Sequence, residues 1–169
     1  MRYTLPAHAT AVFRPAGRIV LVDADDRILL IRIEDPAISE PDLWITPGGA
    51  CESAESPAEA ARRELIEETG ICVTDVEPCI WRRRHRWKWA DQWIDSDERF
   101  FFCRIGEPPN IDPAGSTQLE MQVIRDYRWW TALELQNTSH ETFVPRRLAQ
   151  LIAPLLRGEI PAEPIDVGI

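Results

Sequence analysis

The sequence predicts an α/β domain, because strand-like and helix-like patterns alternate along its 169 residues. Residues 18–22, 28–32 and 98–105 are short apolar runs rich in β-branched or aromatic side chains, which is typical of strands. Residues 57–69 and 148–155 instead carry apolar side chains at helical spacing. This length suits one domain with a full hydrophobic core. We therefore expect a single domain over the whole chain, with short tails at both ends.

The first part of the chain predicts a β-hairpin. Residues 1–15 indicate a tail that leads into a short extended segment at residues 9–13. The apolar runs 18–22 and 28–32 follow, and the polar residues 23–27 between them suit a turn. Because both runs are apolar at nearly every position, we expect strands that are covered on both faces.

A helix is predicted between Ser56 and Gly70. Ser56 suits the N-cap, and Pro57 suits the first helical position, where a missing N–H costs nothing. Glu59, three residues after the cap, completes a capping box. Good helix formers fill the segment up to Gly70, which ends the helix.

Three glutamates, Glu64, Glu67 and Glu68, project from one side of this helix beside an apolar stripe. Like charges at these spacings repel by roughly 0.2–0.5 kcal/mol per pair, so we expect a cation beside them. Clustered carboxylate oxygens are hard ligands, which suit Mg²⁺ or Mn²⁺. The alternative is a solvated acidic face with Arg62 and Arg63 as local partners.

A longer pattern around these glutamates favours the metal site. Gly49 is followed after five residues by Glu55, and after seven more by the run Arg63-Glu64-Leu65-Ile66-Glu67-Glu68-Thr69-Gly70-Ile71. This pattern over residues 49–71 resembles the Nudix box at every specified position. With the tryptophan-bearing segment near residue 130, the resemblance covers about residues 9–157.

The resemblance implies a Nudix hydrolase with an α/β/α sandwich fold, a mixed sheet held between helices. The implied activity is Mg²⁺- or Mn²⁺-dependent cleavage of the pyrophosphate bond in a nucleoside diphosphate linked to another moiety. By the family pattern, Arg63 orients the glutamates, and Glu55 is the acidic residue near the loop–helix junction. The implied metal ligands are the carbonyl of Gly48 and the carboxylates of Glu64, Glu67 and Glu68.

A glutamate is also expected to act as general base, either in the box or in a later loop. In several Nudix enzymes a loop glutamate before a tryptophan-bearing strand reaches back to the metals. Glu120 occupies that place here, and Glu98 is the second choice. For either residue the alternative is a surface glutamate. The expected catalytic residues are therefore Arg63, Glu64 and Glu120.

The sequence alone leaves other functions open. One is a non-catalytic Nudix-fold module for ligand binding or regulation, and another is an isomerase that acts on an allylic diphosphate. The intact glutamates disfavour the first, because a module without catalysis has no use for their mutual repulsion. The substrate is open as well: a nucleoside triphosphate, a nucleotide sugar and a capped RNA end all fit.

The run at residues 81–89 combines five cationic residues with tryptophans. As a strand, it places Arg82, Arg84, Arg86 and Lys88 on one face, and Arg83 with the aromatic residues on the other. Guanidinium groups bind phosphate oxygens, so Arg82, Arg84 and Arg86 are candidates for substrate binding, while the aromatic rings suit stacking on a base. The alternative is a half-buried strand with a solvated basic face and core tryptophans.

The remaining elements follow from turn and capping residues. Thr131 and Glu134 form a capping box that opens a short helix. A last helix starts near Pro145, and Pro154 kinks or ends it. We expect loops or turns at residues 34–42, 90–97 and 106–115, strands at 72–80 (in one or two pieces), 98–105 and 127–130, and an extended tail at 161–169.

The composition of the chain limits its possible binding partners and its expected location in the cell. A net charge of −9 argues against a stable nucleic-acid partner. No apolar run has the length of a membrane span, and no signal-peptide pattern opens the chain, so we expect a cytoplasmic protein. The four cysteines and three histidines are dispersed, which predicts neither a disulfide framework nor a zinc site. A nucleotide or another diphosphate compound is the expected partner. The tail suits packing either along the domain or against the second subunit of a homodimer.

Overall fold

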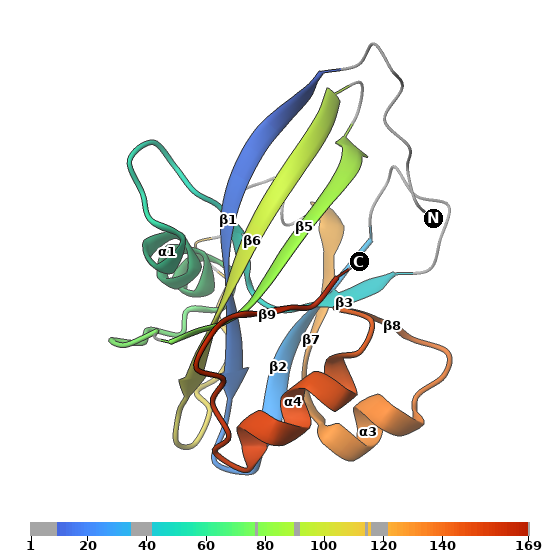
Figure 1. The fold of residues 1–169 in the computed structure, drawn as a ribbon. Coiled ribbons are helices and arrows are strands. Elements are labelled where there is room, and N and C mark those ends of the chain that lie inside the picture. The colour runs from blue at the N-terminus through green and yellow to red at the C-terminus, as the bar shows by residue number, and fades with distance from the viewer. Residues whose placement is uncertain are drawn as a thin grey trace.

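The computed structural model of the protein describes residues 10–34, 42–76, 78–89, 92–113, 115 and 122–168. Figure 1 shows the elements within these residues. The strands are β1 (Ala11–Val22), β2 (Arg27–Ile33), β3 (Leu43–Ile45), β4 (Gly48–Ala50), β5 (Cys79–Trp89), β6 (Gln92–Arg104), β7 (Ile124–Thr131), β8 (Thr142–Val144) and β9 (Ile165–Asp166). The helices are α1 (Pro57–Thr69), α3 (Ala132–Asn137) and α4 (Leu148–Leu156).

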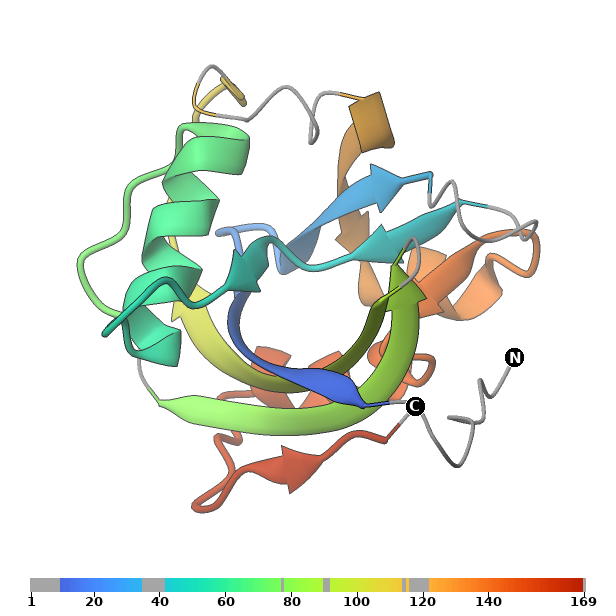
Figure 2. The same ribbon diagram turned by 90° about the horizontal axis from the view of Figure 1, so that it is seen from above.

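The strands form one curled sheet with the order β8-β3-β2-β1-β6-β5-β9, in which β4 also pairs with β1 and β7 with β2. The sheet is mixed, because β1 runs parallel to β6 but antiparallel to β2 and β4. Seen from above, β1, β6 and β5 curve across from β2 and β3 (Figure 2). Helix α1 packs against β1 and β4, and α3 and α4 cover the opposite face, so the predicted α/β arrangement is confirmed.

Each face of the sheet has its own hydrophobic core. Alternate residues of β1 supply them: Ile19 and Leu21 pack toward α1, and Val20 and Val22 pack toward α4. This confirms that the apolar run is covered on both faces. The first core also contains Leu29, Ala61, Leu65 and Phe101, and the second contains Trp44, Trp81, Phe100, Trp130, Phe143, Ile152 and Leu155.

The hairpin is confirmed, but several strand boundaries differ from expectation. β1 starts at Ala11, so the extended segment and the first apolar run are one strand. β6 starts at Gln92, so most of the polar segment predicted as a turn belongs to a strand. Its polar side chains are compatible with pairing because Asp95 and Glu98 bind arginines of β5. Conversely, residues 72–76 and 78 contain no strand, and β5 begins only at Cys79.

Both predicted capping boxes are present. Ser56 and Glu59 exchange hydrogen bonds at the start of α1, and Thr131 does the same with Glu134 at the start of α3. Helix α4 begins at Leu148, three residues later than expected, and it contains Pro154 just before its end. The tail contributes β9, which pairs with β5. Within the described segments, none of the helices has the length and apolarity needed to cross a bilayer.

Helix α1 crosses β1 directly above Gly17, so this position leaves no room for a side chain. A Cβ atom at Gly17 would lie 1.7 Å from the carbonyl oxygen of Pro57. We expect Gly17→Ala to lower the free energy of unfolding by about 3 kcal/mol, since the helix must move away from the sheet. Gly106→Ala is the control, because a Cβ there meets nothing within 4 Å. Denaturant unfolding of both variants measures the effect, and equal stabilities would contradict this account of the packing.

Candidate active site

Two buried carboxylates of α1 lie directly on the Gly48–Gly49 turn. Glu64 and Glu68 are only 8% and 6% exposed. The backbone N–H of Gly48 donates a 2.9 Å hydrogen bond to Oε2 of Glu68. A Cβ at Gly49 would lie 2.3 Å from Oε1 of Glu64, so only glycine leaves room for that carboxylate. Gly48 also has φ of +137°, a conformation that favours glycine.

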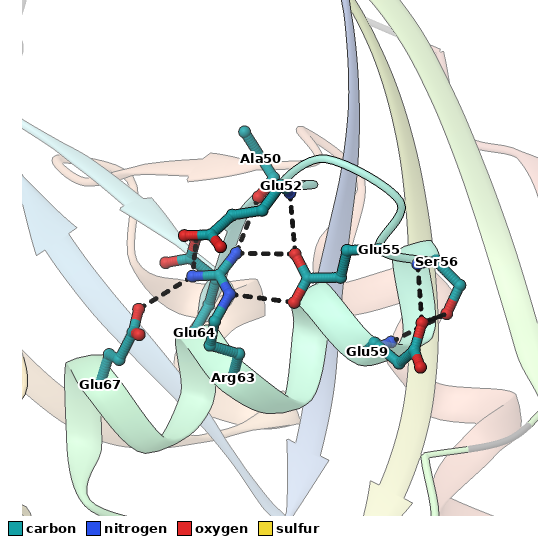
Figure 3. A network of polar contacts seen from close by, with 8 residues as sticks. All are labelled: Ala50, Glu52, Glu55, Ser56, Glu59, Arg63, Glu64 and Glu67. Carbon is teal, nitrogen blue, oxygen red and sulfur yellow. Dashed lines mark hydrogen bonds and ion pairs between the residues drawn. The ribbon is translucent and has the colours of Figure 1, made fainter.

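Arg63 links the carboxylates around this turn (Figure 3). Its Nε and Nη2 bind the two oxygens of Glu55, each at 3.0 Å. Its Nη1 donates to Glu64 at 3.0 Å and to Glu67 at 2.9 Å, and its Nη2 also reaches the Ala50 carbonyl at 2.9 Å. These bonds, above all those to Glu55, raise the pKa of Arg63. The guanidinium therefore fixes three carboxylates and offsets part of their repulsion.

The donor set suits a hard divalent cation. Glu64, Glu67 and Glu68 offer carboxylate oxygens, and the adjoining turn offers backbone carbonyls, which are the ligands that Mg²⁺ and Mn²⁺ prefer. Across the part of the chain that the structure describes, however, no three Asp, Glu, His or Cys side chains converge on one point. Arg63 lies between Glu64 and Glu67 instead, so binding of a metal requires a small rearrangement of these side chains.

The structure therefore brings together Gly48, Arg63, Glu64, Glu67 and Glu68, five of the residues selected from the sequence. The proposed base Glu120 lies outside the described residues. Its alternative Glu98 is on β6 and only 2% exposed.

Glu98 is the centre of a buried network that the sequence did not reveal. Its carboxylate accepts hydrogen bonds from Nε of Arg18 at 2.6 Å and from Nε of Arg83 at 2.5 Å. Burial by itself would raise the pKa of Glu98, but Arg18 and Arg83 lower it to about 2. Arg18 also donates from Nη1 to the carbonyls of Thr46 at 2.9 Å and Gly48 at 3.3 Å. The network thus reaches the same turn that Glu68 binds.

Three arginines expected to bind substrate lie on the other face of β5. Arg82, Arg84 and Arg86 are exposed, whereas Arg83 is buried. Arg84 binds both oxygens of Asp95 at 3.0 Å, and Arg86 binds one of them at 3.3 Å. The predicted alternation is confirmed, and the structure separates these three side chains from Arg83 and Glu98. The sequence alone could not show that Arg83 shares a face with Arg18, because this depends on how β1, β5 and β6 pair.

His85 sits beside this network and is neutral at physiological pH. Its Nδ1 atom is 3.8 Å from Oε2 of Glu98 and has no hydrogen-bond partner among the described residues. Burial, and then the charge of Arg83, lower the pKa of His85 to about 4 from an ordinary 6.5. As the pH falls, His85 therefore takes up its proton at a higher pH in the unfolded chain than in the folded chain.

Stability should consequently fall as the pH drops from 6.5 to 4. The unfolded state takes up the His85 proton in this window and the folded state does not, which lowers the free energy of unfolding by about 3 kcal/mol. We expect His85→Gln to flatten this part of the pH profile, as measured by denaturant unfolding. His140→Gln, at an exposed histidine, should keep the wild-type slope. A wild-type slope in His85→Gln would show that His85 titrates normally.

The chain is similar in sequence to a known protein family and to several known proteins. A family model described as NUDIX domain matches residues 12–151. The RNA pyrophosphohydrolase of Saccharophagus degradans is 42% identical over 65 residues, covering 38% of this chain and 36% of that protein. The RNA pyrophosphohydrolase of Teredinibacter turnerae is 28% identical over 152 residues, covering 84% of this chain and 86% of that protein. The chain thus spans about a third of the first relative and most of the second.

Solved structures share the fold. The crystal structure of the MutT protein from Methanosarcina mazei Go1 has a TM-score of 0.61 and 15% sequence identity, and the match covers 88% of this chain and 96% of that one. At this identity the likeness concerns the fold alone. The region matched by the family model contains α1, the glycine turn and the curled sheet.

Proposed function

This chain belongs to the NUDIX domain family, and on that premise we propose that it hydrolyses the pyrophosphate bond of a nucleotide or another diphosphate compound. One observation carries the proposal: two buried carboxylates, Glu64 and Glu68, are fixed against the Gly48–Gly49 turn. Burying two neighbouring negative charges destabilises a protein unless cations offset them. Such an arrangement is expected where a metal–diphosphate complex binds. The RNA pyrophosphohydrolases among the relatives support the same bond specificity.

Nudix hydrolases generally need divalent metal ions. We propose that Glu64, Glu67, Glu68 and the carbonyl of Gly48 hold Mg²⁺ or Mn²⁺ in this chain. A divalent ion held by these residues would polarise phosphoryl oxygens and make a water molecule more acidic.

The chain's own residues then have separate tasks. Arg63 holds Glu64 and Glu67 in place through Nη1, and Glu55 anchors Arg63 from its other side. The N–H of Gly48 fixes Glu68. A glutamate accepts the proton of the attacking water, and we propose Glu120 or one of the α1 glutamates for this step.

Substrate contact by Arg82, Arg84 and Arg86 remains a proposal of its own. Since these side chains are exposed and lie on the face opposite Arg83, they suit a part of the substrate that extends beyond the edge of the sheet. Asp95 already neutralises part of the charge of Arg84 and Arg86, which weakens any such contact.

Glu68→Gln tests the metal-binding role. The amide oxygen can still accept the hydrogen bond from Gly48, and the substitution removes repulsion, so the fold should be retained. We expect turnover of a diphosphate substrate with Mg²⁺ or Mn²⁺ to fall about 100-fold, because a lost metal ligand removes several kcal/mol of transition-state stabilisation. A screen of diphosphate compounds, with analysis of the products, identifies the bond that breaks.

The exposed Glu163→Gln is the matched control and should keep wild-type turnover. Full activity in Glu68→Gln would refute the role of Glu68. A wild-type protein that binds diphosphates but cleaves none of them would favour the alternative, a non-catalytic binding module.

A further inference from the structure

The face of the sheet that carries Glu98 also carries three arginines. Residues at alternate positions of a strand share a face, so Arg14 and Arg18 of β1 lie on one side. The register pairs Arg14 with Ser96, Ala16 with Glu98, and Glu98 with Arg83, which brings Arg83 to the same side. In the described parts of β1, β5 and β6, three guanidinium groups therefore share this face with one carboxylate. We call Arg14, Arg18, Arg83 and Glu98 the arginine face.

The guanidinium groups of this face keep hydrogen-bond donors that the described residues do not use. Arg83 is 7% exposed, and only its Nε has a partner in the described part of the chain, which is Glu98. Toward the described residues, Arg18 uses Nε and Nη1 but not Nη2. Arg14 makes no hydrogen bond or ion pair with any described residue. A guanidinium has five N–H donors in a planar fork, so several donors remain for an external acceptor.

The charges on this face are also unbalanced. Among the described side chains of β1, β5 and β6 on this face, Arg14, Arg18 and Arg83 contribute three positive charges and Glu98 one negative charge, while His85 is neutral. Glu64 and Glu68 of α1 act on Arg14 and Arg18 from the neighbouring turn. Burial lowers the pKa of Arg83, whose charge has lost most of its contact with water, whereas Arg14 is exposed at the outer end of the same face. A desolvated charge without a full partner is unfavourable, so an anion on this face would gain charge-assisted hydrogen bonds.

The arginine face adjoins the proposed metal site. Arg18 donates to the carbonyl of Gly48, the turn that also binds Glu68. The charges of Glu68 and Glu64 act on Arg18, and the charge of Glu64 acts on Arg14. An anion on the arginines would therefore lie next to a diphosphate held at the carboxylates.

We propose that the arginine face binds a further phosphate of the substrate, so that the preferred substrate carries a chain of three or more phosphates. The inference deepens the proposed function and depends on it. A diphosphate linked to a neutral sugar would leave the donors of Arg14 and Arg83 without a partner. A third phosphate supplies an anionic, multidentate acceptor at this position.

Arg14→Gln tests the proposal with little risk to the fold, because Arg14 is exposed and has no ion pair with a described residue. The probes are methylene-bridged nucleoside diphosphate and triphosphate analogues, which resist hydrolysis, measured by calorimetry with Mg²⁺. We expect Arg14→Gln to weaken the triphosphate analogue about tenfold, as for one lost charge-assisted hydrogen bond, and to leave the diphosphate analogue within about twofold. Arg83→Gln, checked for folding by thermal denaturation, should act in the same direction.

Arg99→Gln is the matched control. It removes one arginine from the opposite face of β6, where Arg99 pairs with Asp97, and it should change neither affinity. Equal weakening of both analogues by Arg14→Gln, or no weakening of either, would overturn the proposal.

Turnover by the wild type separates this inference from the proposed function. Faster cleavage of a nucleoside triphosphate or of a 5′-triphosphorylated oligoribonucleotide than of a nucleotide sugar supports the inference, and the faster of the first two identifies the source of the phosphate chain. A preference for the nucleotide sugar overturns the inference but keeps the hydrolase. Cleavage of none of them overturns the hydrolase, while the calorimetry still decides whether the arginines bind phosphate.

Discussion

The close approach of helix α1 to the sheet at Gly17 and Gly49, and of β4 to β1 at Gly48, is the constraint on which the site depends. A Cβ atom would lie 1.7 Å from Pro57 at Gly17, 2.2 Å from the Gly17 carbonyl at Gly48, and 2.3 Å from Glu64 at Gly49. Without side chains at these positions, the helix can rest directly on β1 and β4. The carboxylates of Glu64 and Glu68 are then held against the backbone rather than in solvent. Geometry, burial and charge at the site all follow from this contact.

Arg63 makes that close contact compatible with the charge of the helix. Its guanidinium binds Glu55, Glu64 and Glu67 at once, from within the same helix and from the loop before it. A surface ion pair contributes little, but a fork that orders several carboxylates also reduces their freedom to move. The same residue that stabilises the acidic cluster therefore also limits the movement of its side chains.

Local sequence signals made α1 and its site predictable, but they did not reveal the contacts between strands. The cap at Ser56, the glycine turn and the alternation along β5 depend on neighbours in the sequence, and the structure agrees with each of them. The extent of β6 was misjudged because its polar residues are neutralised by β5. Arg18 was missed because its partner Glu98 lies 80 residues further along the chain. Only the register of β1 and β6 brings these two together.

Because of that register, negative carboxylates and a positive guanidinium group meet at the same turn. The carboxylates of α1 approach the Gly48–Gly49 turn from one side of the sheet, and Arg18 approaches it from the other. A protein with a net charge of −9 repels a free oligophosphate at long range, so attraction has to be built locally. Guanidinium groups beside the proposed metal-binding carboxylates meet this requirement, because opposite charges a few ångströms apart are weakly screened. Recognition of the phosphate chain then depends on these neighbouring groups rather than on the overall charge of the protein.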